Sequence, residues 1–273
     1  MRIGPSTSIP TASSPTVGRE RRRLLIDPTQ RVAQGRVITL SESERHYLRR
    51  VLRLRFGDQV DVVNGRGGLW LASLEATDRL LLTSDPDQPL LLEPKPKQRL
   101  GLAVALMRRD TDVWIRMACE LGIDELQPVL SERCVPQADQ RLERWQSIVQ
   151  ESVEQCERLW APQLHPVRPI KDALDRIDGP VAMAVTRQQN GQPLSAWLAS
   201  TGQCHSAWVL VGPEGGWTAA EQALVTTDGG SAVSLGCSIL RSSTAAVRAA
   251  VELVQWRESQ SDCQLSPQSA PAP

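Results

Sequence analysis

The chain has 273 residues, enough for one large or two modest domains, and its 41% apolar content can fill a core. Basic and acidic residues number 31 each, so the net charge is zero and any RNA contact has to come from a local patch. The six cysteines are scattered, which argues against a structural zinc site, and no apolar run is long enough to cross a membrane. We therefore expect a cytoplasmic protein without a metal ion.

Both ends of the chain lack the apolar residues of a core. Residues 1–20 are rich in Ser, Thr, Pro and Gly, and residues 258–273 are rich in Ser, Gln and Pro. Such segments cannot bury enough apolar surface to offset the entropy of ordering. We predict a disordered leader and a loose tail, with the folded part between them.

The first predicted helix carries a basic face. It follows a predicted strand at 37–40, and Ser41 and Glu44 have the spacing of a capping box. The apolar residues of 45–54 fall on one stripe and leave another face to four arginines, Arg45, Arg49, Arg50 and Arg53. Arginines near an aromatic such as Tyr47 suit the phosphates and bases of RNA. The alternative interpretation is an ordinary solvated helix face.

Short strands follow this helix. Their patterns lie at 59–63, 69–74 and 80–83, separated by turns rich in glycine and aspartate. Residues 21–90 are therefore predicted to form a compact β-barrel. A link at 84–97, rich in proline and charged residues, marks the boundary to a second domain at 98–257.

In the second domain, strands alternate with helices. Apolar runs of strand length occur at 100–106, 126–130, 181–185, 208–211 and 232–235, and helical patterns lie at 111–121, 140–159, 170–177 and 244–257. Val113, Trp114, Met117 and Leu121 form the predicted inward face of the first of these helices. The alternation predicts an α/β domain with a parallel sheet, whose ligands bind at the carboxyl ends of the strands.

Two of these strands end in glycine loops. The strand at 208–211 stops at Gly212-Pro213-Glu214-Gly215-Gly216, after which Thr218 and Glu221 have the spacing of a second capping box. The strand at 232–235 runs into Gly236 and then Ile239-Leu240-Arg241-Ser242-Ser243-Thr244-Ala245. A bare loop followed by a helix start offers backbone N–H groups to a ligand. Together, the two loops predict one pocket.

This pair of motifs resembles the knotted SPOUT RNA methyltransferases, and within them the ribosomal RNA small subunit methyltransferase E family. That family has Gly-Pro-Glu-Gly-Gly, followed by Leu-Gly-x-x-Ile-Leu-Arg-x-x-Thr-Ala. The resemblance implies a C-terminal trefoil-knotted parallel-sheet domain preceded by a small PUA-like β-barrel. It also implies a symmetric homodimer whose interface completes the site.

The resemblance further implies methyl transfer from S-adenosylmethionine to N3 of a uridine in small-subunit (16S) ribosomal RNA, free or in the 30S particle. By match to the motifs, the cofactor is expected at Leu210, Gly212, Pro213, Gly215, Gly216, Leu235, Gly236, Ile239, Leu240 and Thr244.

Two charged residues of the motifs are candidates for catalysis. Arg241 is expected to contact the substrate or the transition state, with a salt bridge that fixes its loop as the alternative. Glu214 is a candidate proton acceptor, with a capping contact to nearby N–H groups as the alternative. Arg109 and Arg133 each lie near a predicted strand end and are weaker candidates for RNA contact.

The chain departs from the family pattern at three positions. Ser243 stands where relatives carry glutamate, Met117 where many have lysine, and Glu157 where glycine is usual. Two other functions stay open. One is a knotted methyltransferase that acts on transfer RNA, at a ribose or a base. The other is an RNA-binding homologue with weakened catalysis.

Overall fold

The computed structural model describes residues 21–28, 32–135, 141–186 and 191–262. The predicted leader, residues 1–20, and most of the predicted tail lie outside the described residues. The part of the tail that is described, residues 258–262, continues the last helix, α8 (Ser242–Asp262), so the prediction of a loose tail from 258 was wrong there.

A small, mostly antiparallel sheet comes first in the chain. Its order is β1-β4-β5-β6-β3-β2, and β7 also pairs with β5. The strands are β1 (Arg23–Leu25), β2 (Val32–Gln34), β3 (Val37–Thr39), β4 (Gln59–Val63), β5 (Gly68–Ala76), β6 (Arg79–Leu82) and β7 (Leu91–Leu92). All four predicted strands of this region are confirmed. β7 lies within the predicted link, where it forms a strand by pairing with the start of β5.

The predicted helix at the start of this region is shorter than expected and changes type. Ser41 caps α2 (Glu42–His46), and Glu44 returns a hydrogen bond to the Ser41 N–H at 2.6 Å, so the predicted capping box is confirmed. From Tyr47 to Val51 the backbone forms a wider π-helix. Leu48 is its fully buried anchor.

The second sheet is parallel throughout, as predicted. Its order is β10-β9-β8-β14-β12-β15-β13, with β11 also paired to β9. The strands are β8 (Arg99–Ala105), β9 (Glu125–Leu130), β10 (Gln163–Leu164), β11 (Arg168–Pro169), β12 (Val181–Ala184), β13 (Gln192–Pro193), β14 (Ser206–Val211) and β15 (Ser231–Ser234). Three of them are only two residues long, too short to leave a pattern in the sequence. The trefoil knot stays a prediction.

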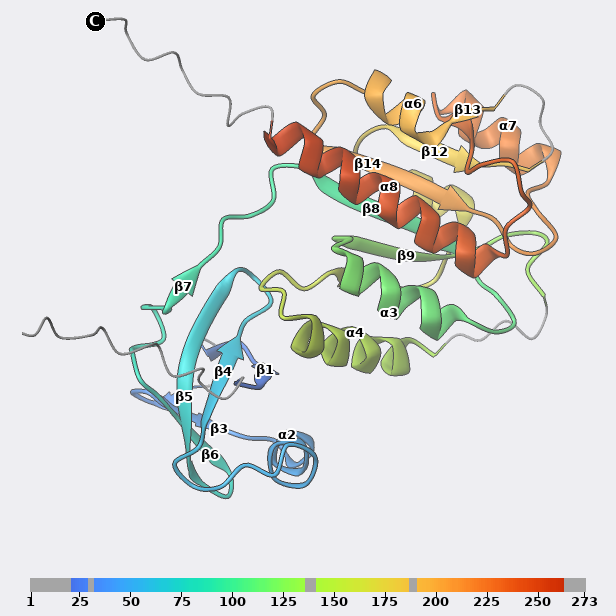
Figure 1. The fold of residues 1–273 in the computed structure, drawn as a ribbon. Helices are drawn as coiled ribbons and strands as arrows, with labels where there is room; N and C mark the ends of the chain where they lie inside the picture. Colours follow the sequence, from blue (N-terminus) through green and yellow to red (C-terminus); the bar gives the residue numbers. More distant parts are fainter. Residues whose placement is uncertain (1–20, 29–31, 136–140, 187–190, 263–273) are drawn as a thin grey trace, which may run out of the picture.

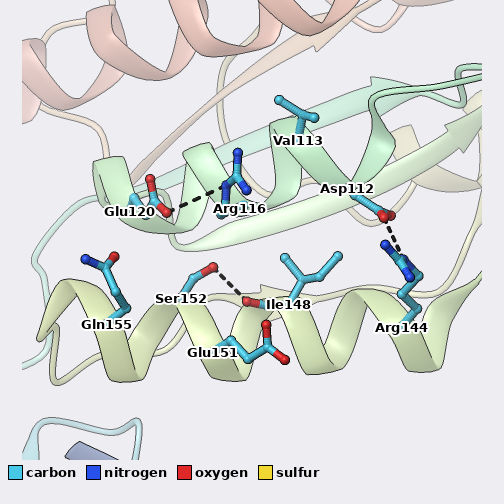
Figure 2. Close-up of a pocket in the computed structure, with 9 residues that line it drawn as sticks. All are labelled: Asp112, Val113, Arg116, Glu120, Arg144, Ile148, Glu151, Ser152 and Gln155. Carbon is cyan, nitrogen blue, oxygen red and sulfur yellow. Dashed lines mark hydrogen bonds and ion pairs between the residues drawn. The ribbon is translucent and has the colours of Figure 1, made fainter. Parts of the chain in front are cut away.

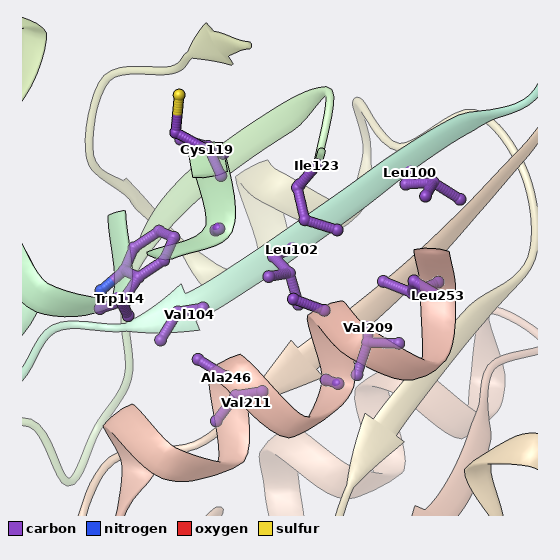
Figure 3. Close-up of a cluster of buried hydrophobic side chains, with 14 of the residues drawn as sticks. Leu100, Leu102, Val104, Trp114, Cys119, Ile123, Val209, Val211, Ala246 and Leu253 are labelled. Atoms are coloured by element: carbon purple, nitrogen blue, oxygen red, sulfur yellow. The ribbon is translucent and has the colours of Figure 1, made fainter. Parts of the chain in front are cut away.

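Helices cover both faces of this sheet (Figure 1). They are α3 (Thr111–Leu121), α4 (Leu142–Cys156), α5 (Ile170–Leu174), α6 (Leu194–Ser200), α7 (Ala219–Thr227) and α8. Alternate residues of β8 enter two different cores. Leu102 and Val104 pack with α3 and α8 on one face (Figure 3), while Ala103 packs with α5 and α7 on the other. This two-sided burial explains why the strand is apolar throughout.

The inward face of α3 differs from the predicted one. Trp114 is buried as expected, but Ile115, Ala118 and Cys119 complete the buried face, whereas Val113 and Met117 are half-buried. The reason is that α3 packs between α8 and α4 and so buries more than one stripe.

The small sheet is joined to the segment after α4. Gly67 N–H donates to the Leu159 carbonyl and Ala161 N–H donates to the Gly65 carbonyl, both at 2.9 Å. Val63 and Leu69, from β4 and β5, belong to the same apolar cluster as β8 and α3. The two parts of the chain are therefore packed against each other, while the small sheet also has an apolar cluster of its own. Across the described residues, no helix combines the length and apolar character needed to span a membrane.

Candidate cofactor and RNA site

The two glycine loops lie at the same edge of the parallel sheet. β12 pairs with β14 on one side and with β15 on the other, all in the same direction. The loop after Val211 and the loop after Ser234 therefore leave the sheet on either side of the end of β12. The sequence predicted that the two loops form one pocket. The strand order places both loops at one edge of the sheet, and the pocket itself stays a prediction.

The first loop is a tight turn that leads directly into α7. Gly216 N–H donates to the Pro213 carbonyl at 2.8 Å, and Gly216 has a φ of +70°, in the left-handed region that favours glycine. Thr218 and Glu221 form the predicted capping box, which is confirmed. Because these two residues cap α7, the helix does not need Glu214 for this purpose. The Glu214 side chain is exposed.

Contacts from two other strand ends hold the first loop. The Arg133 guanidinium, after β9, donates to the carbonyls of Gly215 at 3.0 Å and Trp217 at 3.4 Å. The Trp217 indole N–H donates to the carbonyl of Ala184, at the end of β12, at 3.1 Å. The buried Glu221 accepts from Glu132 N–H at 3.0 Å. Arg133 is exposed and positions this loop, and its predicted contact with RNA stays a prediction.

The second loop exposes an apolar residue. Ile239 is 61% exposed, whereas Leu235 and Leu240 are half-buried against the core. Gly236 has a φ of +126° and precedes the loop's outermost residues. Arg241 and Thr244 are exposed, and Arg241 pairs with none of the described carboxylates, so the salt-bridge alternative finds no partner there.

A carboxylate that sequence reasoning missed lies beside the second motif. Asp110 Oδ2 accepts from the Ser243 hydroxyl at 3.4 Å. Asp110 follows β8 with a φ of +72°, an unusual conformation for a residue other than glycine. The position of Asp110, directly after a buried strand at the ligand edge, could have marked it as a candidate site residue. The sequence does not show that this turn faces the start of α8.

The arginines predicted to bind RNA fall into two separate groups. Arg49, Arg50 and Arg53 are exposed on the π-helix and the turn after it, and Arg45 is half-buried. Arg109 is exposed at the carboxyl end of β8, in the other domain. Figure 1 places α2 far from the loops after β14 and β15, so the fold does not bring the two groups together.

The structure also contains a groove away from these loops. It lies between α3 and α4, measures about 380 Å³, and is lined in part by Val113 and Ile148 (Figure 2). An ion pair of 2.6 Å between Asp112 and Arg144 crosses it. None of the predicted cofactor residues lines this groove. The described residues contain no cluster of His, Cys, Asp or Glu that could hold a metal ion.

Two family models match the chain. Residues 93–255 match an RNA methyltransferase domain, and residues 40–85 match an RNA methyltransferase PUA domain. The first match alone covers more than half of the chain.

Individual relatives agree with the family models. The chain is 37% identical to the ribosomal RNA small subunit methyltransferase E of Synechocystis over 246 residues, which cover 87% of this chain and 78% of the relative. It is 30% identical to the protein of that name from Rickettsia conorii, over 82% of this chain and 91% of the relative.

A solved structure shares the fold. The ribosomal RNA small subunit methyltransferase E from Neisseria gonorrhoeae, bound to S-adenosyl methionine, superimposes with a TM-score of 0.69. It is 27% identical and the match covers 85% of this chain and 95% of the other. The motifs, the parallel sheet and these matches agree, and the chain belongs to the ribosomal RNA small subunit methyltransferase E family of RNA methyltransferases.

Proposed function

We propose that the protein transfers the methyl group of S-adenosylmethionine to N3 of a uridine in small-subunit ribosomal RNA. Membership in the family makes it an rRNA methyltransferase that uses this cofactor. The observation that carries the proposal is the convergence of the two glycine loops on either side of β12. The uridine and its N3 come from the resemblance of the two motifs to those of the family.

The residues at this edge fit an adenosine-bearing cofactor. The proposed set is the predicted one: Leu210, Gly212, Pro213, Gly215, Gly216, Leu235, Gly236, Ile239, Leu240 and Thr244. Leu210 is 1% exposed and packs in the core, so only its backbone can face a ligand. Ile239 offers an uncovered apolar surface, which suits a flat aromatic group such as adenine.

The cofactor, when bound, supplies an activated methyl group and its leaving group. The protein then has to align the uridine ring nitrogen with that methyl and to remove the N3 proton. The Arg241 guanidinium, exposed beside the second loop, fits a uracil carbonyl or a phosphate. Glu214 is the proposed proton acceptor, because its exposed carboxylate lies inside the first loop.

Binding of a large RNA is proposed to use both domains. Residues 21–90 would form the RNA-binding domain and residues 98–257 the methyltransferase domain. The proposed RNA contacts are Arg45, Arg49, Arg50, Arg53, Arg109 and Arg133. We further propose a homodimer that acts in the cytoplasm, where a partner subunit would cover the exposed Ile239 loop and complete the site.

The test is a methylation assay with an assembled substrate. The full chain is incubated with methyl-labelled S-adenosylmethionine and small ribosomal subunits from cells that lack the protein, and the digested RNA is separated into nucleosides. Label in 3-methyluridine is the expected result. Label in another nucleoside would overturn the uridine assignment. Cofactor binding by calorimetry without any label would favour the RNA-binding homologue.

A matched pair of glycine variants tests the location of the site. Gly216 and Gly202 have φ values of +70° and +64°, and a Cβ at either position meets no atom within 4 Å. Alanine therefore introduces similar backbone strain at both positions, but only Gly216 lies in a cofactor loop. We expect Gly216→Ala to weaken cofactor binding and Gly202→Ala to leave it unchanged. Equal losses would place the site elsewhere.

A further inference from the structure

The small domain exposes an aromatic ring. Phe56 is the single phenylalanine of the chain, and it is 61% exposed. It lies in the turn between the π-helix and β4, where a polar residue would avoid contact between an apolar ring and water. The apolar cluster of the small domain does not include Phe56. Burial of the ring therefore does not explain why it is there.

One arginine contacts this ring, and others lie in the same segment of the chain. The Arg49 guanidinium carbon lies 5.6 Å from the centre of the Phe56 ring, a cation–π contact. Arg50, Arg53 and Arg55 are exposed in the same segment, and residues 45–57 contain no aspartate or glutamate. The segment that carries the ring is thus positively charged, and positive charge attracts a negatively charged polymer.

The turn that presents the ring is held in place by the sheet beneath it. Leu54 N–H donates to the Leu48 carbonyl at 3.0 Å, and Gly57 N–H donates to the Leu74 carbonyl, in β5, at 2.9 Å. The Asp58 carboxylate accepts from Arg55 N–H at 2.8 Å. With Leu48 fully buried, both sides of the turn are anchored. A pre-organised ring loses little freedom when it binds a flat ligand.

We propose that Phe56 is a stacking platform for an unpaired base of the RNA substrate. Arg49 holds one side of the ring, and the neighbouring arginines bind the phosphates that flank that base. A base inside a duplex has both faces covered, so the platform selects a nucleotide from a loop, a bulge or a single strand.

This inference rests on the proposed function for its ligand and adds a contact remote from methyl transfer. Figure 1 places α2 and the adjoining turn at the opposite end of the molecule from the loops after β14 and β15. The platform therefore acts as an anchor and not as part of the reacting centre. Its loss should raise the KM for small subunits and leave kcat unchanged.

The experiment compares Phe56→Ala with Phe56→Trp in the full-length protein. Binding of a fluorescent single-stranded oligoribonucleotide and of a blunt duplex of equal length is measured over a series of salt concentrations. Leu92→Ala is the matched control, because Leu92 is 67% exposed but lies in β7. If one base stacks on the ring, Phe56→Ala should lower the affinity for the single strand by about 5-fold to 150-fold. Phe56→Trp should restore this affinity.

The salt dependence separates stacking from charge. Removal of a stacking ring should leave the slope of log affinity against log salt unchanged, whereas Arg50→Ala, which removes a proposed phosphate contact, should reduce the slope by about 0.7. Equal affinity of Phe56→Ala and the unchanged chain for single-stranded RNA would overturn the platform, and so would an equal loss for the duplex. If the unchanged chain methylates no RNA but Phe56→Ala still weakens single-strand binding, the platform stands and the proposed function fails.

Discussion

Ser243, which stands where the resembled motif has glutamate, contacts the Asp110 carboxylate. The contact places an acidic group beside position 243, supplied by the turn after β8. That turn adopts a left-handed backbone at Asp110. At the scale of single residues, Asp110 thus joins Glu214 and Arg241 among the exposed charged groups near the two loops.

Arg241 is predicted to act on the substrate and not on the cofactor. Its exposed guanidinium pairs with no described carboxylate, so Arg241→Ala should leave the fold and the cofactor Kd unchanged. The rate of methyl transfer should fall by about 100-fold, the usual effect of removing one donor from a developing charge. Single-turnover assays and calorimetry measure the two effects. Arg116→Ala, an exposed arginine on α3, is the control, and a matching fall there would refute a specific role.

Cys156 is predicted to be an unusually reactive thiol. The neighbouring Cys119 thiol, as a hydrogen-bond donor, lowers the pKa of Cys156 below that of an ordinary thiol, which raises its thiolate fraction at pH 7. The rate of its alkylation by iodoacetamide should level off above a midpoint near that pKa. Cys119→Ala removes this donor and should move the midpoint upward. Burial raises the pKa of Cys156, and the hydrogen bond that offsets this effect is then gone. Mass spectrometry of the digest, with the exposed Cys237 as internal reference, measures the rate, and an unmoved midpoint would disprove the coupling.

At the scale of elements, the end of α4 organises its neighbours. Arg158, the first residue after its C-cap, donates to the carbonyls of Cys119 at 2.8 Å and Ile123 at 2.9 Å, around the end of α3. It also pairs with Asp124, which in turn pairs with Arg257 of α8 at 2.6 Å. Three helices are thus joined through two arginines and one carboxylate. This explains a structural need for Arg158, independent of catalysis.

The C-cap of α4 carries backbone strain that a substitution should relieve. Glu157 has a φ of +64°, the left-handed conformation that glycine adopts most easily. We expect Glu157→Gly to raise the free energy of unfolding by up to about 1 kcal/mol, since relief of strain exceeds the loss of an exposed ion pair with Arg23.

Urea unfolding measures this effect. Glu157→Val is the comparison, because a β-branched residue tolerates the left-handed region least. The Arg23 side chain also bonds the backbone carbonyl of residue 157, a contact that all three chains can retain. A valine variant as stable as the glycine variant would show that backbone strain is not the cause.

At the scale of the whole molecule, Glu154 joins the small domain to α4. It is 7% exposed, and it accepts from Leu25 N–H, in β1, at 2.9 Å and from Gln150 at 3.3 Å. Burial raises the pKa of the Glu154 carboxyl above its ordinary value of 4.5. Between 4.5 and the raised pKa, the folded protein keeps a proton that the unfolded chain releases. The contribution of Glu154 to stability is therefore present below pH 4.5 and is lost as the pH rises through the raised pKa.

Two variants separate the hydrogen bond from the charge. Glu154→Gln keeps an acceptor for Leu25 N–H and cannot ionise, so its stability should fall less than that of the unchanged chain between pH 4.5 and pH 8. Glu154→Ala leaves a buried N–H without a partner and should cost about 1–3 kcal/mol. Urea unfolding at several pH values measures both. Parallel pH profiles for the glutamine variant and the unchanged chain would contradict the assignment.

The sequence determined the local structure and the chemistry of the loops. Residue types whose backbone preferences act over a few neighbours specify these features: the two capping boxes, the parallel α/β alternation and both glycine loops. The same local rules missed β10, β11 and β13, which are two residues long, and the change to a π-helix at Tyr47.

Only the tertiary structure decided which loops meet. The order of strands places β12 between β14 and β15. This order brings together two motifs whose first residues lie more than twenty positions apart in the sequence. It also turned Arg133 inward to the first loop, placed Asp110 beside Ser243 and left Phe56 exposed among arginines. The contacts of Arg133 and Asp110 join residues distant in the chain. Periodicity and capping preferences carry no information about them, because such preferences depend on neighbours in sequence and not on the packing of the sheet.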